Sequence, residues 1–393
     1  MRVGAEGGSW LDQRIARSAE GAGYTGAMGA AAVGPDAGDK LPKGGTRVTP
    51  EAVAWALRLF CGREPADEAE LAYHCAHPSL DTLRRAFAET WEFRQFLNTV
   101  QNVRPRFGVP VFLLRPPAEN IPWKFEPPTL DEPVSQLCTA SQFQEPVFAE
   151  IAAAMCVPAN AHRKTWEHCY IISVLATYGM IGMGRRALGF GCGRERIPAL
   201  LASRGVEVLA TDAPEGGTAN DQGWRSTDQF AGNLADLFYP QIIHLDDFER
   251  LVGFEPVDMN AIPAALDGQF DCCWSSCALE HLGSLQHGLD FIENSLRSLK
   301  PGGIAVHTTE FNLSSDVDTV ETPGLSLYRR QDLEKLAARL TAQGHEVLPL
   351  NLHPGYDPVD EHIDVPPYGL PHLKVMVQKV AVTSVGIVVR KGS

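Results

Sequence analysis

Side chains that could remove a proton stand near the ends of two apolar runs. The run FDCCWSS is followed closely by ALEH, which ends in His281, and the run GIAVHTTEF contains His307 and Glu310. Imidazole and carboxylate groups act as general bases when they lie within hydrogen-bond reach of the proton that they remove. Strand alternation would place His307 and Glu310 on opposite faces. These three residues are the candidates for proton transfer.

A glycine-rich stretch carries a second group of candidate residues. The sequence RRALGFGCGRERIPALLASRGVEVLATDA contains Gly189, Gly191 and Gly193, and it ends in Asp212 and Ala213. Glycine lets backbone N–H groups approach a ligand closely, because no side chain intervenes. An acid at the end of the next strand can accept hydrogen bonds from ribose hydroxyls. The stretch therefore predicts a nucleoside site.

These residues need a sheet that brings them together. Strand candidates are RALGF, VEVLATD, FDCCWSS, GIAVHTTEF, HEVLPLNL and SVGIVVR, and short helical runs separate most of them. This alternation predicts a doubly wound, mostly parallel α/β sheet with helices on both faces. Ligands of such sheets bind beyond the carboxyl ends of the strands, where we expect both groups of candidates to lie.

The chain before this sheet falls into three predicted segments. Residues 1–46 are rich in Gly and Ala and predict a flexible tail. A threonine–proline pair then opens a series of helical patterns, which predicts a small helical domain over residues 47–103. Residues 104–140 hold many prolines and predict a linker. The α/β domain would occupy residues 141–393.

The glycine spacing does not match the dinucleotide fingerprint G-x-G-x-x-G. The third glycine position is Arg194 when counted from Gly189, and Arg196 when counted from Gly191. A tight seat for a pyrophosphate is therefore disfavoured. A nucleotide-dependent oxidoreductase stays as an alternative, and so does a glycine turn that binds nothing.

Over about residues 160–393 the chain resembles the class I S-adenosylmethionine-dependent methyltransferases. Their first strand carries acid-x-G-x-G-x-G, and Gly191 and Gly193 of GFGCGRE match its first two glycines. Gly189 stands where that family has an acid, and Glu195 stands where it has the third glycine. The segments VDMNAIP, FDCCWSSCALEHL and LKPGGIAVHTTEF resemble the adenine segment, the fourth strand and the fifth strand of the family.

The resemblance implies a Rossmann-like methyltransferase fold with S-adenosylmethionine as cofactor. Asp258 and Met259 would bracket the adenine, and another group must hold the cofactor's ammonium in place of the missing acid. The family often covers the cofactor with the helix before the first strand, where Trp166 would either close the pocket or serve as an ordinary core aromatic. The implied cofactor-binding residues are Gly189, Gly191, Gly193, Asp212, Ala213, Asp258, Met259, Ser275 and Ser276.

The expected reaction is methyl transfer to a small molecule or glycan at a hydroxyl oxygen. Positioning supplies much of the rate, and a hydroxyl acceptor needs a base, for which His281, Glu310 and His307 are the candidates. No metal is expected, although Glu310 with Asp316 or Asp318 is an alternative donor set. A non-catalytic cofactor-binding module of the same fold is the other alternative.

An insertion between the last two strand candidates carries three more histidines. It is the segment LHPGYDPVDEHIDVPPYGLPHLK, with His353, His362 and His372. Long loops in such positions often carry functional residues. We expect this segment to act as a lid on the acceptor side.

Composition limits the class of partner and the compartment. The chain has 34 Lys and Arg against 48 Asp and Glu, a net charge of −14, which argues against nucleic-acid binding. Nine cysteines without metal-binding spacing predict reduced thiols. No apolar run reaches the length of about eighteen residues typical of a membrane span, and no signal-peptide pattern is present. We expect a cytoplasmic protein; the oligomeric state is not predicted.

Overall fold

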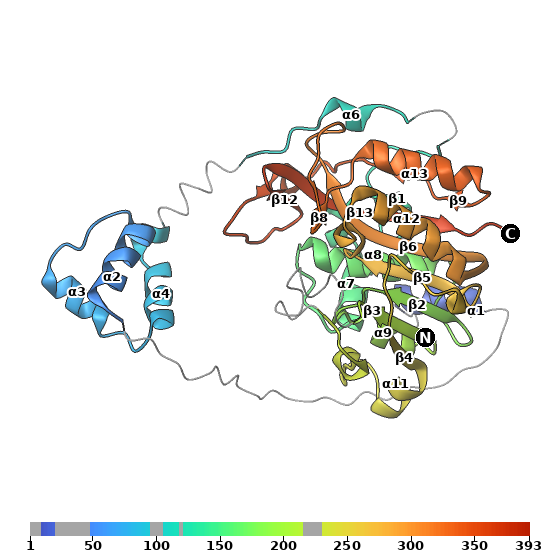
Figure 1. Ribbon diagram of the computed structural model, residues 1–393, viewed down its shortest axis with the longest axis horizontal. Coiled ribbons are helices and arrows are strands. Elements are labelled where there is room, and N and C mark those ends of the chain that lie inside the picture. The colour runs from blue at the N-terminus through green and yellow to red at the C-terminus, as the bar shows by residue number, and fades with distance from the viewer. Residues whose placement is uncertain (1–8, 20–47, 95–104, 118–120, 215–229) are drawn as a thin grey trace, which may run out of the picture. The chain divides into compact units, whose positions relative to one another are not determined.

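The computed structural model describes residues 9–19, 48–94, 105–117, 121–214 and 230–393. They form two compact units (Figure 1). The smaller unit contains residues 48–94, and the larger unit contains residues 9–19 and the described residues from Arg106 onward. Each unit is considered by itself.

The smaller unit is helical, in agreement with the sequence pattern. It consists of α2 (Pro50–Ala56), a π-helical turn (Leu57–Cys61), α3 (Glu68–Cys75) and α4 (Leu80–Ala88). Thr49 caps α2 by accepting a hydrogen bond from the N–H of Ala52. Val53, Leu83 and Phe87 lie in its core. Residues 95–103 of the predicted helical domain lie outside the described residues.

The first described segment is a helix and not part of a flexible tail. α1 (Trp10–Ala19) buries Leu11 in the core of the larger unit, and the Trp10 N–H donates to Glu150 at 2.6 Å. The prediction for residues 1–46 therefore fails at α1, because its apolar side chains find a tertiary partner that composition does not reveal. The other residues of that segment lie outside the described residues.

The proline-rich segment belongs to the larger unit. It contains α6 (Val111–Leu114) and β1 (Ser135–Gln136), and β1 pairs in parallel with β10 (Leu350–Asn351). Leu113 is fully buried, and the Phe107 N–H donates to the carbonyl of Glu361 at 2.7 Å. The unit thus includes residues before the expected boundary at 141.

The larger unit is built on the predicted doubly wound, mostly parallel sheet. Its main strands are β2 (Arg186–Phe190), β3 (Glu207–Asp212), β4 (Val252–Pro256), β5 (Phe270–Ser276), β6 (Leu299–Asn312) and β13 (Val380–Arg390). Their order is β4-β3-β2-β5-β6-β13, and β13 alone among these six runs antiparallel to its neighbour (Figure 1). The direction of strand order reverses at β2, which creates a crevice at the carboxyl ends.

Short strands extend this sheet at the β13 side. They are β9 (Glu346–Val347), β11 (Ile363–Asp364) and β12 (Lys374–Val377), and a separate hairpin joins β7 (Glu321–Thr322) to β8 (Leu325–Ser326). The predicted strand HEVLPLNL is divided between β9 and β10, which pair with different partners. β4 was not predicted, because VGFEP is short, half-exposed and contains Gly and Pro.

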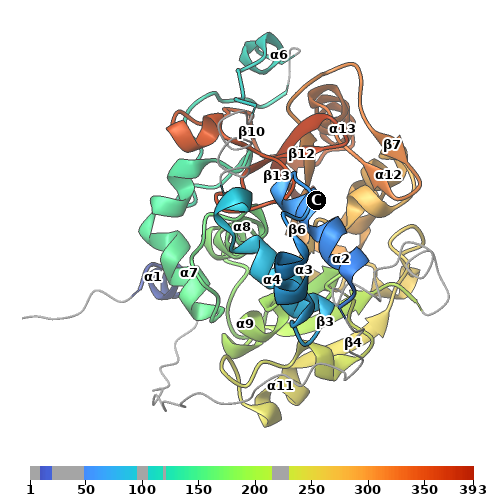
Figure 2. The same ribbon diagram turned by 90° about the vertical axis from the view of Figure 1, so that its left-hand side faces the viewer.

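Helices cover both faces of the sheet. They are α7 (Pro146–Ala154), α8 (Arg163–Thr177), α9 (Ile197–Ser203), α11 (Leu245–Leu251), α12 (Leu285–Ser295) and α13 (Arg330–Ala342). The first four contribute to one buried cluster, and α12 and α13 contribute to the other. Figure 2 shows α9 and α11 beside β3 and β4.

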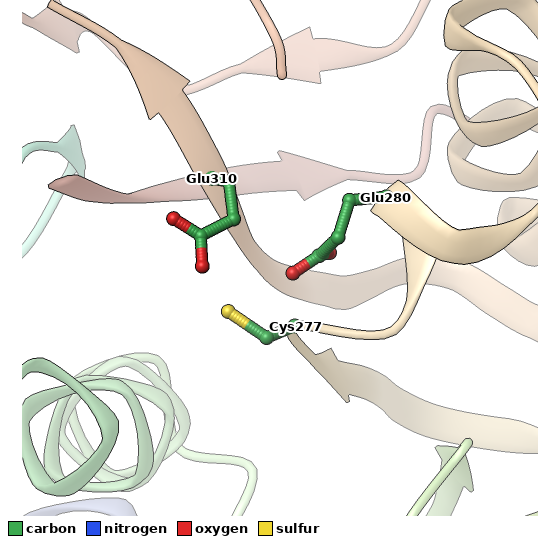
Figure 3. Close-up of side chains that lie close together, drawn as sticks. All are labelled: Cys277, Glu280 and Glu310. Carbon is green, nitrogen blue, oxygen red and sulfur yellow. The ribbon is translucent and has the colours of Figure 1, made fainter. Parts of the chain in front are cut away.

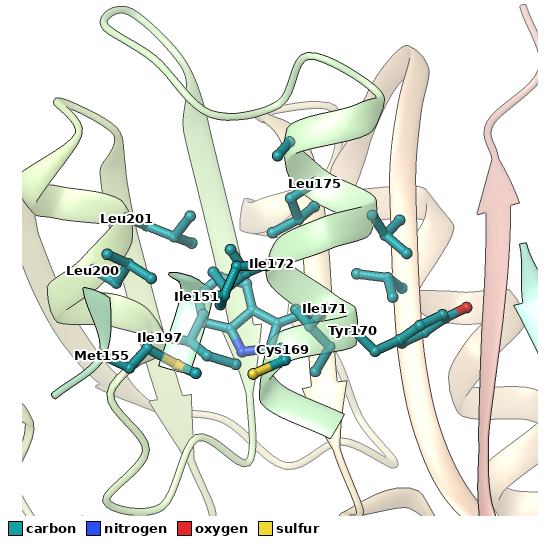
Figure 4. Close-up of a cluster of buried hydrophobic side chains, with 14 of the residues drawn as sticks. Ile151, Met155, Cys169, Tyr170, Ile171, Ile172, Leu175, Ile197, Leu200 and Leu201 are labelled. Carbon is teal, nitrogen blue, oxygen red and sulfur yellow. The ribbon is translucent and has the colours of Figure 1, made fainter. Parts of the chain in front are cut away.

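Apolar packing holds α8 against the sheet. Ile171, Ile172 and Leu175 are fully buried among side chains of α7 and α9 (Figure 4). Trp166 is also fully buried and stacks on Tyr170, with ring centroids 4.8 Å apart. Each such side chain contributes about 1.5–3 kcal/mol when it is removed from water. The charged first turn of α8 is thereby held at the carboxyl ends of the strands.

Candidate active site

The turn after β2 exposes bare backbone. Gly191 has φ +58° and Gly193 has φ +52°, in the left-handed region that favours glycine. A Cβ on Gly191 would lie 2.9 Å from the Cβ of Ala278 and 3.3 Å from the sulfur of Met259. The turn therefore needs glycine for its conformation and, at Gly191, for space.

A cavity of about 730 Å³ opens beside this turn. That volume lies within the range of about 300–1,000 Å³ typical of small-molecule sites. Its walls come from the glycine turn, the ends of β3, β5 and β6, the segment after β4 and the first turn of α8. The predicted site residues on these walls are Gly191, Gly193, Asp212, Ala213, Asp258, Met259, Ser276, His281 and Glu310.

Asp212 is held against the glycine turn by backbone donors. Its Oδ2 accepts from the N–H groups of Gly193 at 3.0 Å and Ala231 at 3.1 Å, and its Oδ1 accepts from Ala213 at 2.8 Å. Burial raises the pKa of Asp212, and these hydrogen bonds oppose that rise. A carboxylate has about four acceptor positions, so Oδ1 keeps capacity for a hydroxyl of a ligand.

His307 does not reach the cavity, so its predicted catalytic role is wrong. It is fully buried, its Nδ1 lies 2.8 Å from the hydroxyl of Ser275, and its Nε2 lies 3.1 Å from the hydroxyl of Ser295. Burial lowers the pKa of His307 to about 3. Alternation along β6 turns this ring toward α12 and turns Glu310 toward α8. Ser275 is also buried and does not line the cavity, so its predicted role in cofactor binding is wrong too.

Gly189 is also absent from the cavity wall, although the sequence predicted that it binds the cofactor. A Cβ at this position would lie 2.4 Å from both the sulfur of Cys192 and Cζ2 of Trp274. The glycine therefore makes room for the indole of Trp274, on the neighbouring strand β5.

The first turn of α8 supplies cavity residues that the sequence analysis missed. Arg163, Lys164 and His168 line the cavity, whereas Trp166 takes the alternative position in the core. Arg163 and Glu167 lie four residues apart, on one face of a helix that is otherwise mostly apolar. This charged face could have indicated a site at the start of the helix.

Glu167 organises the charges beneath the cavity. It is fully buried and accepts hydrogen bonds from Lys164 Nζ at 3.1 Å, Ser276 Oγ at 3.1 Å and Cys277 Sγ at 3.0 Å. Burial opposes ionisation, but the charges of Lys164 and Arg163 prevail and lower the pKa of Glu167 to about 2. This carboxylate is therefore ionised and fully engaged.

Glu310 is placed differently. Its Oε1 lies 2.5 Å from Nη1 of Arg163, and its buried Oε2 has no hydrogen-bond partner among the described residues. Burial raises the pKa of Glu310 to about 7, although the cation of Arg163 opposes this. The arrangement leaves one carboxylate oxygen available to a ligand.

Three potential metal ligands meet at the same place. Figure 3 shows Cys277, Glu280 and Glu310, whose ligand atoms lie within 4.8 Å of one another. Arg163 already pairs with Glu310, and the thiol of Cys277 donates to Glu167. Because protein side chains already engage these groups, we assign no metal here. The alternative donors Asp316 and Asp318 are not part of this cluster.

His281 lies on the cavity wall in a short 3₁₀ turn (Leu279–His281) after β5. Its Nδ1–H donates to the carbonyl of Gly324 at 2.7 Å, and its Nε2 lies 4.0 Å from Glu280 Oε1. Its role in proton transfer stays a prediction.

The predicted lid does not line the cavity. No residue of the described segment 352–374 belongs to its walls. The ring of His372 stacks on that of His162, with centroids 4.6 Å apart, and His162 does line the cavity. The insertion therefore supports the wall from behind.

The family comparison agrees with this geometry. Residues 188–307, from β2 to β6, match the family model described as a methyltransferase domain. This part of the chain therefore matches a methyltransferase domain. S-adenosylmethionine is the cofactor that the sequence resemblance implies for such a domain. The bare wall at Gly191, the available Oδ1 of Asp212 and the cavity volume fit it.

Solved methyltransferases are similar to this chain at low identity. The CurJ carbon methyltransferase is 16% identical with a TM-score of 0.36; the match covers 63% of this chain and 60% of that chain. A methyltransferase from Aquifex aeolicus is 17% identical with a TM-score of 0.30, covering 55% and 87%. Phosphoethanolamine N-methyltransferase 2 of Haemonchus contortus, solved with S-adenosyl-L-methionine, is 18% identical with a TM-score of 0.29, covering 45% and 37%. These likenesses carry no information about the acceptor.

Curated proteins include no significant match to this chain. Among the helices of the described residues, none is long and apolar enough to cross a membrane.

Proposed function

We propose that this methyltransferase domain methylates a hydroxyl oxygen of a small molecule or glycan, with Glu310 as the general base. The observation that carries the proposal is the unpartnered Oε2 of Glu310 on the cavity wall, on a carboxyl whose pKa burial raises to about 7. A base is most effective when its pKa lies near the working pH.

The cofactor-binding side of the cavity is formed by the ends of β3 and β4. Asp212 would accept a hydrogen bond from a ribose hydroxyl, and Asp258 and Met259 would border the adenine. When bound, S-adenosylmethionine supplies the methyl group that is transferred. The residues of the chain contribute mainly by holding the acceptor oxygen in position, which is a large part of catalysis in such displacements.

The acceptor side is formed by the exits of β5 and β6. Glu310 Oε2 would take the hydroxyl proton, while Arg163 holds Oε1 and keeps the carboxyl from rotating. His281 stays the alternative candidate, because its Nδ1–H donates to the carbonyl of Gly324, which makes Nε2 the basic nitrogen. Glu280 is held by the hydroxyl of Thr309 at 2.9 Å.

An acceptor screen tests this proposal. The full chain is incubated with S-adenosylmethionine carrying a labelled methyl group and with matched alcohols, sugars, phenols, amines and thiols, and the products are identified by mass spectrometry. We expect O-methyl products. Glu310→Gln should lower kcat by about 10²–10⁴-fold, the usual contribution of a general base, with the cofactor KM unchanged.

Two results would count against it. Methylation of amines or carbon acceptors without any alcohol product would exclude the hydroxyl assignment. Cofactor binding without transfer to any acceptor class would favour the non-catalytic module.

A further inference from the structure

We infer that Glu195 holds the α-ammonium group of the cofactor, an assignment that rests on the proposed function because it places the cofactor in this cavity. Glu195 directly follows the glycine turn and lines the cavity, with 7% of its surface exposed. S-adenosylmethionine carries an ammonium at one end and a nucleoside at the other, so a carboxylate away from the nucleoside side is a suitable partner for the ammonium.

The position of Glu195 meets this requirement. Asp212 ends β3, and Asp258 follows β4, so both acids lie on the nucleoside side. Glu195 instead contacts β5, where Nε1 of Trp274 donates to its Oε1 at 2.6 Å. Its Oε2 lies 3.6 Å from Nε2 of His168, in α8. It therefore stands between the nucleoside side and the acceptor side.

The packing around Gly189 explains why the carboxylate is found here. The indole of Trp274 occupies the space that any side chain at residue 189 would need, 2.4 Å from the ideal Cβ. The same indole orients Glu195 through its N–H. An acid at residue 189 and Trp274 in its present position exclude each other, whereas Glu195 and Trp274 support each other.

The other acids on the acceptor side already have a protein partner, and Glu310 already has a cationic one. Glu310 pairs with Arg163, and Glu280 accepts from Thr309. Glu167, which is not part of the cavity wall, is saturated with donors.

Glu195 lacks a full counter-charge among the described residues that face it. Lys164 acts on it from α8 but donates to Glu167, and burial lowers the pKa of His168 to about 4, so that ring is neutral. Asp212 and Cys192 add no positive charge. Burial raises the pKa of Glu195 to about 8. A buried carboxyl of this kind gains from a ligand cation, because pairing offsets the cost of burying its charge.

Two ligands separate this role from a general effect on the cavity. S-adenosylhomocysteine contains the ammonium, whereas 5′-methylthioadenosine has the nucleoside and the sulfur but no amino-acid portion. By calorimetry at pH 7, Glu195→Gln should weaken S-adenosylhomocysteine binding at least tenfold and change 5′-methylthioadenosine binding less than threefold. Glu249→Gln, on the exposed face of α11, is the matched control and should bind both ligands as the wild type does.

Proton release gives a second readout. Pairing with the ammonium should ionise Glu195, so the wild type should release up to about one proton on binding S-adenosylhomocysteine at pH 7. Binding heats in two buffers of different ionisation enthalpy measure this release, and Glu195→Gln should abolish it. If that variant does not fold, Glu195→Asp is used. Its shorter side chain displaces the carboxylate, which should weaken the binding of S-adenosylhomocysteine and not that of 5′-methylthioadenosine.

The outcomes are distinguishable. Equal losses for both ligands, or unchanged S-adenosylhomocysteine affinity in folded Glu195→Gln, would overturn the role of Glu195 and leave the proposed function standing. A wild type that binds neither ligand would overturn both. Selective loss together with loss of proton release supports the assignment.

Discussion

Nη1 of Arg163 lies 2.5 Å from Oε1 of Glu310, and this ion pair joins the first turn of α8 to the end of β6 at the cavity wall. The pair holds one oxygen of the carboxyl and leaves Oε2 without a partner among the described residues. Arg163 is thus a positioning residue for the proposed base.

The first prediction concerns the pH dependence of the reaction. Only ionised Glu310 can accept a proton, and its pKa is about 7. We therefore expect kcat/KM to rise as pH increases toward 7 and to level off above it. Arg163→Gln should move this rise to higher pH, because the lost cation no longer favours the carboxylate. A flat profile from pH 6 to 8 in the wild type would remove Glu310 as the base.

The second prediction concerns the ribose site. Asp212→Ala should weaken S-adenosylhomocysteine binding by about 1–3 kcal/mol, through loss of charge-assisted hydrogen bonds. Isothermal titration calorimetry measures this change. Asp247→Ala, on the exposed face of α11, is the control and should bind normally. Equal affinities in the two variants would show that Asp212 does not contact the cofactor.

The third prediction concerns the packing of β2 against β5. Gly189→Ala should lower the free energy of unfolding by about 1–3 kcal/mol, the usual cost of overpacking, because its Cβ would overlap Trp274 and Cys192. Gly108→Ala is the control, since its Cβ would meet nothing within 4 Å. Urea denaturation of both variants measures the difference. If Gly189→Ala is as stable as the control, the indole is free to move.

The fourth prediction concerns His307. His307→Ala should destabilise the fold by about 1–3 kcal/mol, because it leaves buried hydroxyls without their partner. The cofactor affinity and kcat of the folded variant should stay within about threefold of the wild type, as expected for a residue outside the cavity. A selective loss of kcat would restore the catalytic role that its burial contradicts.

The same residue makes a prediction about acid stability. The pKa of His307 is about 3 in the folded chain and about 6.5 in an unfolded chain. The unfolded state therefore binds more protons between these values, and stability falls as pH drops through this range. The free energy of unfolding of the wild type should therefore exceed that of His307→Ala by less at pH 5 than at pH 7. Urea denaturation at both pH values tests this.

Local pattern was sufficient to place most of the predicted cofactor-binding residues on the cavity wall. The turn at Gly191 and Gly193, Asp212 at the end of β3 and the Asp258–Met259 pair were all predicted and all line the cavity. Each belongs to a short strand-and-turn segment, and a parallel sheet necessarily gathers the carboxyl ends of its strands at one edge.

The acceptor side could not be predicted in the same way. Alternation separates His307 from Glu310, but it does not say which face of β6 meets the cavity. The docking of α8 makes that choice, since its apolar residues pack on the face that carries Glu310 and bring Arg163 and Lys164 with them. The sequence also left two positions open for Trp166, and only the tertiary packing places it in the core.

The order of residues along the chain was thus enough to specify the doubly wound sheet, the glycine turn and the position of Asp212 beside that turn, because these depend on spacing within single segments. The contacts between Arg163 and Glu310 and between Trp274 and Glu195 arise only when the chain folds, since each joins elements that are distant in sequence. Their physical basis is side-chain packing across strands and helices, which spacing does not encode.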